Sequence, residues 1–445
     1  MNPAVSADSP PPLLCADIGT SRLKAALIDA EGRLLRSAAE PYRGPPPACW
    51  EGAFYRSLCA LGLAAAGEGP AGPSGEVPPG SGVVPPLPGP ELIVISGNGP
   101  TLVPVTRDGV SLRPVFWFDE ALPPPPGLAG RAGPEGRAGI PSFFLPRVRA
   151  FSERRREDYE RTAFFLPPQE WLSWRLGASP VTVIPHGGYE PYYWDKEQCA
   201  ALGLDRGKFP PLVKMGAVTG RTSGTGPLGG GVPIAAAGPD FIMALIGTAV
   251  LEPGMCCDRT GSSEGINLCA AERPQEQFPS LRILPHAAEG LWNVGALIPR
   301  SGRRFDEFLA GNPYPLLSTG EILERLILGP PCPGKAVLEE MAGELNAALE
   351  TLERAGFPAE ELVISGGQAK NPLWNQYKAD MTGRIFLEPE IIDAELAGNA
   401  VLGALILKGG SLRERASGMI RIRRRYTPGG GLQRSMPQRS TRPLA

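Results

Sequence analysis

The sequence predicts an α/β protein of two domains. Short strand-like apolar runs alternate with helix-like runs along the 445 residues, the pattern of sheets covered by helices. This length is enough for two domains, each with its own hydrophobic core. A Gly- and Thr-rich stretch at 220–231 marks a division between them.

Five apolar runs predict strands at 13–18, 23–28, 92–95, 232–236 and 362–364. The clearest helix spans 336–354, where apolar residues recur at three- and four-residue steps and Gly356 and Pro358 end the pattern. A second helix is expected at 394–408, before Gly409 and Gly410. The Pro- and Gly-rich stretches 67–90 and 123–139 are expected to be surface loops or disordered insertions, and residues 1–12 and 426–445 disordered ends.

The composition argues against several classes of protein. The formal net charge is −2, so no basic field attracts nucleic acid or an anionic membrane. The eight cysteines are irregularly spaced and there are two histidines, which disfavours a disulfide framework or a structural metal site. The first residues lack the basic and apolar regions of a signal peptide, and no apolar run approaches the roughly 20 residues of a membrane span. A cytoplasmic protein is expected.

Two nucleotide-binding patterns occur in degraded form. Residues 329–336 have the glycine and lysine spacing of a Walker A loop, but prolines remove backbone donors and Ala336 replaces the magnesium-binding hydroxyl. Residues 224–229 match G-x-G-x-x-G, yet an extended run follows where a dinucleotide site needs a helix. We interpret the first as a loop leading into a helix and the second as a linker turn.

The stretch 14–33 carries a more coherent set of groups. Asp17 ends an apolar run, a turn with Thr20 and Ser21 follows, and Lys24 lies in the next run. A phosphate with bound magnesium needs a carboxylate, hydroxyl and N–H donors, and a cation. An ordinary hairpin turn uses the same residue types, so this stretch alone leaves both interpretations open.

Three further segments favour the phosphate site. Asp240 follows a Gly-Pro break after the strand at 232–236, and residues 259–265 repeat the combination of hydroxyls and glycine. Residues 362–374 run from a strand through Gly366 and Gly367 into a helix, so a flat ligand can approach bare backbone there.

Taken in order, the motifs Asp17-Ile-Gly-Thr-Ser, Trp117-Phe-Asp119, Gly238-Pro-Asp240, Gly261-Ser-Ser and 365–374 resemble the FGGY carbohydrate kinases, including their xylulokinase-like members. The resemblance covers about 13–410. It implies two actin-like, ribonuclease H-type domains of the sugar kinase (ASKHA) fold flanking a central cleft: a sugar-binding domain at 13–245 and an ATP-binding domain at 246–425. It also implies an ATP-dependent phosphotransferase acting on a hydroxyl of a ketose, such as a pentulose or hexulose, or of a polyol.

The resemblance assigns roles residue by residue. Asp240 would be the general base, and Asp17 would hold Mg²⁺ through water. The residues expected to bind ATP are Thr20, Ser21, Lys24, Gly261, Ser262, Gly366, Gly367 and Asn371. Those expected at the sugar are Asn98, Trp117, Asp119, Asp240 and Phe241; an ordinary buried tryptophan is the alternative for Trp117.

Two departures from the family pattern lie at the sugar. Asn98 stands in a Ser-Gly-Asn-Gly-Pro run where many relatives carry a Gln-Met-His-Gly-like run, and Phe241 replaces an amide that often follows the catalytic aspartate. Both changes remove hydrogen-bond partners for a sugar, so the substrate is expected to differ. A non-catalytic sugar or nucleotide sensor on the same fold is the alternative. Arg22 has no assigned role, and a homodimer is left open.

Overall fold

The computed structural model describes residues 10–63, 88–122, 140–224, 226–261, 263–274, 278–311, 314 and 316–430. The loop expected at 123–139, most of the one at 67–90, residues 1–9 and 431–445 of the expected disordered ends, and Ser262 lie outside these ranges. The chain forms two compact units. The first comprises Met1–Ala249, Pro285–Glu289 and Ala394–Ile420, and the second comprises Val250–Leu284, Gly290–Asp393 and Arg421–Ala445.

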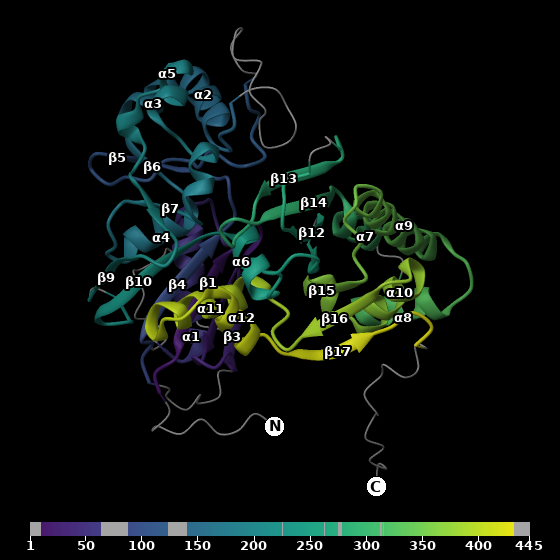
Figure 1. Ribbon diagram of the computed structural model, residues 1–445. Helices are drawn as coiled ribbons and strands as arrows, with labels where there is room; N and C mark the ends of the chain where they lie inside the picture. Colours follow the sequence, from purple (N-terminus) through teal and green to yellow (C-terminus); the bar gives the residue numbers. More distant parts are fainter. Residues whose placement is uncertain are drawn as a thin grey trace. The chain divides into compact units, whose positions relative to one another are not determined.

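The first unit is built on a six-stranded sheet in the order β3-β2-β1-β4-β10-β9 (Figure 1). β1 pairs in parallel with β4 and β4 with β10, whereas the β3-β2-β1 part and the β9 edge are antiparallel. The strands are β1 (Leu13–Ile18), β2 (Arg22–Ile28), β3 (Leu34–Pro41), β4 (Leu92–Gly97), β9 (Val218–Ser223) and β10 (Gly230–Pro239).

Helices cover both faces of this sheet. α1 contacts β2 and β3, and α4 contacts β4, β9 and β10. α11 packs against β1, β2 and β4, and it also packs against α6. Alternation along β1 explains this, because successive side chains point to opposite faces of a strand and all six residues are buried. The helices are α1 (Ala48–Leu61), α4 (Pro168–Leu176), α6 (Asp240–Gly247), α11 (Ala394–Lys408) and α12 (Leu412–Met419).

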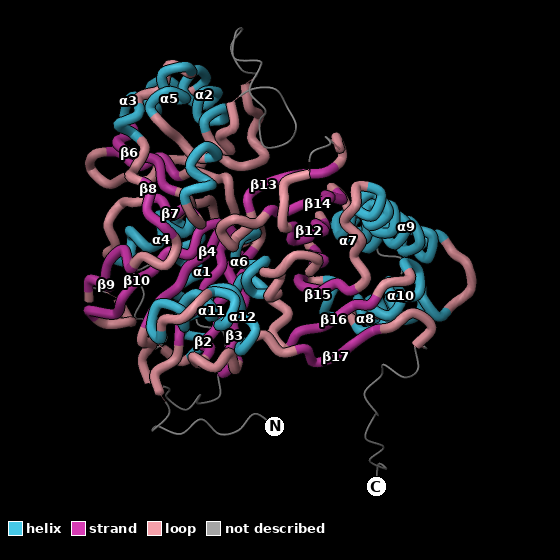
Figure 2. Tube along the Cα trace, viewed as in Figure 1, coloured by secondary structure: helices cyan, strands magenta, loops and turns pink. Residues whose placement is uncertain are grey.

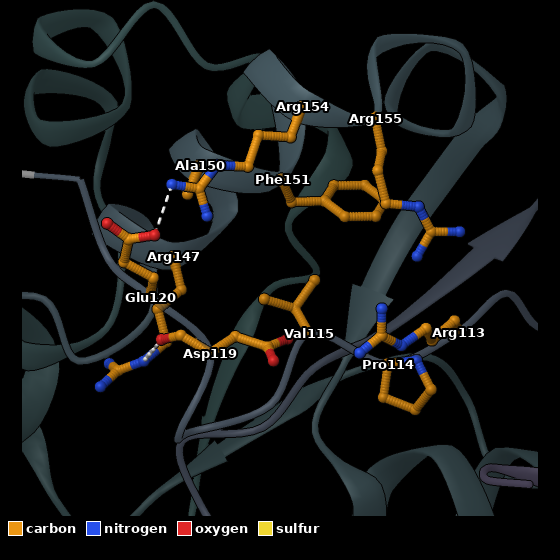
Figure 3. Close-up of a pocket in the computed structure, with 10 residues that line it drawn as sticks. All are labelled: Arg113, Pro114, Val115, Asp119, Glu120, Arg147, Ala150, Phe151, Arg154 and Arg155. Carbon is orange, nitrogen blue, oxygen red and sulfur yellow. Dashed lines mark hydrogen bonds and ion pairs between the residues drawn. The ribbon is translucent and has the colours of Figure 1, made fainter.

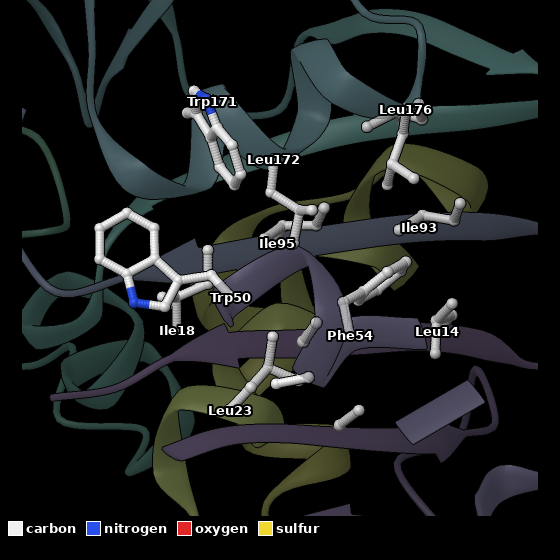
Figure 4. Close-up of a cluster of buried hydrophobic side chains, with 14 of the residues drawn as sticks. Leu14, Ile18, Leu23, Trp50, Phe54, Ile93, Ile95, Trp171, Leu172 and Leu176 are labelled. Carbon is white, nitrogen blue, oxygen red and sulfur yellow. The ribbon is translucent and has the colours of Figure 1, made fainter. Parts of the chain in front are cut away.

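The main core of the first unit lies under α1 and α4 (Figure 4). Leu14 and Ile18 of β1 and Ile95 of β4 meet Trp50 and Phe54 of α1 there. On the opposite side of β1, a Cβ at Gly403 of α11 would lie 2.9 Å from the Leu13 side chain, so α11 lies close against the strand. Asp17 shares the face of Leu13, and this alternation brings it to the side covered by α11.

Smaller elements complete the first unit (Figure 2). They are β5 (Val103–Thr106), β6 (Thr162–Leu166), β7 (Thr182–Ile184), β8 (Leu212–Lys214), α2 (Leu145–Arg154), α3 (Arg156–Arg161), α5 (Lys196–Ala201) and the 3-10 helices η1 (Gly187–Tyr192) and η2 (Arg206–Lys208).

The second unit repeats the central strand pattern of the first. Its seven-stranded sheet has the order β13-β14-β12-β11-β15-β16-β17, with β14-β12-β11 antiparallel and β11, β15 and β16 parallel. The strands are β11 (Cys256–Thr260), β12 (Glu264–Ala270), β13 (Leu281–Pro285), β14 (Trp292–Ile298), β15 (Glu361–Gly366), β16 (Ile385–Pro389) and β17 (Ile422–Tyr426). The helices are α7 (Ser301–Ala310), α8 (Thr319–Leu328), α9 (Pro333–Arg354), α10 (Pro372–Thr382) and the 3-10 helix η3 (Gln368–Lys370).

The predicted elements are all present; the strand at 13–18 and the helix at 394–408 have the predicted limits, and the others differ by a few residues at their ends. The predicted helices correspond to α9 and α11, and the predicted strands correspond to β1, β2, β4, β10 and β15. The predicted disordered tail is wrong at its first residue, because Tyr426 pairs with Phe386 in β17 and its hydroxyl bonds to Glu388. All eight cysteines are free thiols.

The compact units differ from the continuous limits 13–245 and 246–425. The first boundary falls close to its expected place, after Ala249. The segment Ala394–Ile420, however, returns to the first unit because α11 packs on β1, β4 and α6. No helix in the described part of the chain is long and apolar enough to cross a membrane; the cytoplasmic location stays a prediction.

Candidate active site

Three strands of the first unit end at one edge of its sheet. β1 is parallel to β4 and β4 to β10, and Asp17 and Gly238 both pair with Ser96 of β4. Since parallel strands place their carboxyl ends together, Asp17 at the end of β1 and Asp240 just after β10 come to the same edge. Asn98 follows β4 at this edge, and its backbone N–H donates to Ile18 O at 2.9 Å.

Asp17 is held by a buried hydrogen-bonded chain. Its side chain is almost fully buried, with the residue 3% exposed. Ser96 Oγ donates to Asp17 Oδ1 at 2.7 Å, and Asn399 Nδ2 of α11 donates to Ser96 Oγ at 3.1 Å and to Ala16 O at 2.8 Å. The carboxylate is therefore fixed from β4 and, through Ser96, from a helix almost four hundred residues later.

Charged groups surround Asp17. Lys24 Nζ of β2 lies 3.6 Å from Glu395 Oε2 at the start of α11. Burial raises the pKa of Asp17 to about 7, the negative charges of Glu395 and Asp240 add to the rise, and Lys24 and the Ser96 hydrogen bond oppose it. Such a carboxylate is costly to keep ionised unless a further positive charge is supplied.

Asp240 is the first residue of α6, and it follows an irregular end of β10. The register between β10 and β4 shifts between Ala236 and Gly238, and Gly238 has a φ of 96°, a conformation that favours glycine. The Phe241 N–H donates to Asp240 Oδ1 at 2.7 Å. Together, the break in the strand and the helix start place this half-buried carboxylate at the edge where Asp17 lies.

The turn between β1 and β2 presents exposed polar groups. The Gly19 N–H donates to Arg22 O at 3.1 Å, and Tyr42 Oη donates to Gly19 O at 2.8 Å. These two hydrogen bonds stabilise the turn. Thr20 and Ser21 at its tip are exposed. Arg22 is exposed as well, and nothing in the structure assigns it a role.

Asn98, Trp117 and Phe241 are three of the residues expected to bind the sugar, and they differ in exposure. Asn98 is buried, and the Trp117 N–H donates to Thr101 Oγ1 at 3.3 Å, which ties the Trp117 loop to the segment after β4. The Trp117 residue is 41% exposed, so the alternative of an ordinary buried tryptophan is wrong. Phe241 is half-buried beside Asp240.

Asp119 has a structural partner and also lines a pocket. Its Oδ2 accepts the Phe116 N–H at 2.9 Å, which closes the turn that carries Trp117. The pocket, of about 170 Å³, is drawn in Figure 3. Its charged residues are four arginines and two acids: Arg113, Arg147, Arg154, Arg155, Asp119 and Glu120.

Two of the segments expected to bind the nucleotide, the Gly261 turn and the Gly366–Gly367 segment, meet in the second unit. β11 runs parallel to β15, so the turn at Gly261 and the segment at Gly366 and Gly367 follow neighbouring strand ends. Gln368 Nε2 donates to Gly261 O at 3.3 Å, which joins the two segments directly. Asn371 Oδ1 accepts the N–H groups of Leu373 and Trp374 at 3.0 Å each, so its side chain caps α10.

Gly366 and Gly367 have different structural requirements. Gly366 has a φ of 89°, and a Cβ there would lie 1.8 Å from Thr260 O. A Cβ at Gly367 would meet no atom within 4 Å. Gly366 therefore allows β11 and β15 to approach, whereas Gly367 leaves the backbone open on one side.

Neither degraded nucleotide pattern forms a phosphate loop. Lys335 Nζ donates to Ile327 O at 3.2 Å and to Gly329 O at 3.0 Å, so it binds carbonyls at the end of α8. Pro333 begins α9, which agrees with a loop leading into a helix. Described residues of 224–229 connect β9 to β10 as a turn between strands.

Three residues of the Asp17 site were not predicted from the sequence: Ser96, Glu395 and Asn399. The signal for Glu395 and Asn399 is a carboxylate and an amide within a helix whose other residues are mostly small or apolar. Such buried polar residues require partners, and the structure supplies them from β1, β2 and β4. Among the described residues, no group of three or more His, Cys, Asp or Glu has the arrangement of a metal cage.

Comparisons with known proteins bear on this arrangement. Residues 334–407 match the C-terminal domain of the FGGY family of carbohydrate kinases. The resemblance to the FGGY carbohydrate kinases is confirmed. The matched segment includes nearly all of α9 and α11 and the Gly366 turn, which means that the FGGY match spans parts of both compact units.

Curated relatives carry related names. A glycerol kinase from Alkalilimnicola ehrlichii is 28% identical over 302 residues, which cover 56% of this chain and 60% of the relative. A xylulose kinase from Bacillus subtilis is 21% identical over 317 residues, which cover 60% of this chain and 62% of the relative. The chain thus spans about three fifths of the length of these FGGY relatives.

Solved structures show the fold. A xylulose kinase from Lactobacillus acidophilus has a TM-score of 0.72 at 14% identity, with 94% of each chain covered. A Plasmodium falciparum glycerol kinase solved with ADP has a TM-score of 0.70 at 15% identity, again with 94% of each chain covered. The expected sugar kinase fold is confirmed, and it agrees with the repeated strand order of the two units.

Proposed function

We propose that this protein is an ATP-dependent kinase that transfers a phosphoryl group to a hydroxyl of a sugar or polyol. The observation that carries the proposal is the parallel pairing of β4 with both β1 and β10, which brings Asp17 and Asp240 to the same edge of the sheet in the first unit. A phosphotransferase needs a carboxylate at the metal and a second one at the acceptor hydroxyl. The names of the curated relatives support the same activity.

Asp17 fits a site for Mg²⁺. It is a hard oxygen donor, buried and surrounded by further negative charge, and its pKa is raised to about 7. A cation that binds there would replace the proton and relieve the cost of the buried charge. Asp17 would hold Mg²⁺ through water, and the bound ion would neutralise charge on the phosphates of ATP.

Asp240 would act as the general base. Its position at the first residue of α6 leaves the side chain at the strand-end edge, where an acceptor hydroxyl would donate its proton to the carboxylate. Phosphoryl transfer has a loose transition state in most analyses, so the hydroxyl proton leaves late and a carboxylate of ordinary basicity serves. Thr20, Ser21 and Lys24 would bind phosphate oxygens, and Gly261, Gly366 and Gly367 would accommodate the nucleotide.

The acceptor would be held by Asn98, Trp117 and Phe241. A ketose such as a pentulose or hexulose, or a polyol, is the expected class. The pocket beside Asp119 also holds four arginines, of which Arg154 is paired with Glu120 and Arg155 with Asp158, and an arginine can recognise a carboxylate through two parallel hydrogen bonds, so a sugar acid is a second class to test. A gluconate kinase from Lactobacillus acidophilus shares the fold, with a TM-score of 0.71 at 14% identity.

A coupled assay of ADP release tests the activity. The purified chain is incubated with MgATP and a panel of pentuloses, hexuloses, polyols and aldonates. We expect at least one acceptor to stimulate ADP release above the rate with ATP alone. Thermal stabilisation by a sugar or by ATP, without stimulated ADP release from any acceptor, would instead support the non-catalytic sensor.

A further inference from the structure

A fully buried ion cluster lies inside the second unit. The side chains of Lys378 and Asp258 are 0% exposed and that of Glu264 is 1% exposed. Lys378 Nζ of α10 bonds to Asp258 Oδ2 of β11 and lies 3.6 Å from Glu264 Oε1 of β12. It also lies over the Phe386 ring, 5.1 Å from its centroid. Burying three ionisable groups costs free energy of desolvation, which favours a functional reason for the cluster.

The cluster is placed directly beneath the Gly261 turn. Thr260 of β11 pairs with Glu264 of β12, so only the tip of the hairpin separates Glu264 from Gly261. Asp258 lies two residues before Thr260, and side chains two apart on a strand share one face. Two acidic residues thus flank the base of the hairpin on the side that faces Lys378.

A hydrogen-bonded chain connects the cluster to both nucleotide segments. Ser301 Oγ at the start of α7 donates to Glu264 Oε2 at 2.5 Å. Gln368 Nε2 donates to Ser301 Oγ at 3.4 Å and to Gly261 O at 3.3 Å. Trp374 orients Gln368, because the Trp374 Nε1–H donates to Gln368 Oε1 at 3.0 Å.

Close backbone packing fixes the Gly261 turn against the start of α7. A Cβ at Gly302 of α7 would lie 2.0 Å from Gly261 O, so the first turn of α7 lies directly against the hairpin tip. A movement of Ser301 therefore displaces the first turn of α7, against which Gly261 packs. The position of Ser301 depends in turn on the carboxyl group of Glu264.

We propose that Glu264 and Ser301, supported by Lys378 and Asp258, are positioning residues that hold the Gly261 turn for the ATP phosphates. This inference rests on the proposed function, because it assumes that the turn binds ATP. None of these side chains is proposed to touch the nucleotide or the acceptor. They act through the backbone of Gly261 and through Gln368.

The charge of the cluster predicts that MgATP affinity depends on pH. The groups that face Glu264 are Asp258 from β11, Lys378 from α10 and Ser301 from α7. Burial raises the pKa of Glu264 to about 8, the charge of Asp258 adds to the rise, and Lys378 and the Ser301 bond oppose it. With Glu264 protonated, Asp258 and Lys378 balance each other. When Glu264 ionises, the cluster gains a net negative charge beneath the phosphate-binding turn.

Direct measurement of nucleotide affinity tests the proposal without requiring an acceptor. The dissociation constant of MgATP is measured by titration calorimetry at pH 7.0 and pH 9.0 for the wild type, Glu264→Gln, Glu264→Ala and Ser301→Ala. Glu350→Ala is the control, since this exposed residue accepts a hydrogen bond from Asn346 within α9 and contacts no member of the chain of contacts. Thermal unfolding of each variant is recorded alongside.

We expect Glu264→Ala to bind MgATP at least tenfold more weakly, and Ser301→Ala several-fold more weakly, while Glu350→Ala matches the wild type. Wild-type affinity should fall several-fold from pH 7.0 to pH 9.0, and Glu264→Gln, which cannot ionise but can still accept from Ser301, should not show this fall. Wild-type affinity in folded Ser301→Ala and an identical pH dependence in Glu264→Gln would overturn the positioning role. If the wild type binds no nucleotide at all, the proposed ATP site fails, and this inference fails with it.

Discussion

Ser96 Oγ donates a 2.7 Å hydrogen bond to Oδ1 of Asp17, across two parallel strands of the first unit. The same oxygen accepts from Asn399 Nδ2 at 3.1 Å, so α11 is connected to the carboxylate proposed to hold the metal. Asp17 is thus oriented by Ser96, and Ser96 is held in turn by Asn399. A preorganised carboxylate of this kind loses less entropy when a cation binds.

Ser96→Ala tests this relationship. The change removes a hydrogen bond to a charged group, a loss of about 1.5–3 kcal/mol. We expect kcat/KM for MgATP to fall by roughly one to two orders of magnitude, and the Mg²⁺ concentration for half-maximal activity to rise. Ser152→Ala is the control, because Ser152 bonds to Arg149 O within α2. Equal Mg²⁺ dependence in Ser96→Ala and wild type would mean that Ser96 does not orient the metal site.

The adjacent glycines of the second unit predict contrasting effects. Gly366→Ala places a Cβ against Thr260 O at a φ of 89°, so it should lower the stability by more than about 1 kcal/mol. Gly367→Ala meets no neighbour, and it should unfold at the wild-type temperature while binding MgATP more weakly. Thermal unfolding and nucleotide titration of both variants check this. Wild-type stability of Gly366→Ala would show that β11 and β15 can separate.

Glu170 predicts a pH dependence of stability in the first unit. Its Oε1 accepts the Val183 N–H at 2.9 Å, and burial raises its pKa to about 8 from an ordinary 4.5. A raised carboxyl pKa favours the folded state below the unfolded pKa, and this contribution is lost as the pH rises through the folded pKa. The wild type should therefore lose stability between about pH 4.5 and pH 8, relative to Glu170→Gln.

Thermal melts of the two proteins across this pH range test the difference, with the exposed Glu160→Gln as control. The melting temperature of Glu170→Gln should rise relative to the wild type by an amount equivalent to at least about 1 kcal/mol at pH 8. A constant difference from pH 5 to pH 8 would show that Glu170 is already ionised in the folded protein.

Much of the fold follows from local patterns in the sequence. β1 and β2 are mostly apolar runs around a Gly-Thr-Ser turn, and α9 has apolar residues at helical spacing, so each was predictable from its own residues. Asp17 and Asp240 follow predicted strands, and they share one edge because β1 and β10 both pair in parallel with β4. Two of the motifs that resemble the FGGY family, at 17–21 and 238–240, lie at the ends of these strands.

The place of α11 could not be predicted in this way. Its buried residues lie all round the helix, so periodicity does not indicate the surface on which it packs. Its return to the first unit depends on close contacts such as Gly398 against Met243 O, where a Cβ would lie 2.0 Å away. Glu395 and Asn399 enter the Asp17 site only because of that packing.

Asp240→Asn is the most direct test of the proposed chemistry. The substitution keeps the size and polarity of the side chain but removes the base, and a positioned base contributes typically 10²- to 10⁴-fold to a rate. Acceptor-stimulated ADP release and the dissociation constant of MgATP are measured for this variant and for Asp306→Asn, an exposed control on α7. We predict that Asp240→Asn binds MgATP like the wild type and loses acceptor-stimulated turnover by at least roughly a hundredfold, whereas Asp306→Asn keeps both. Full turnover in folded Asp240→Asn would contradict the assignment of Asp240 as the base.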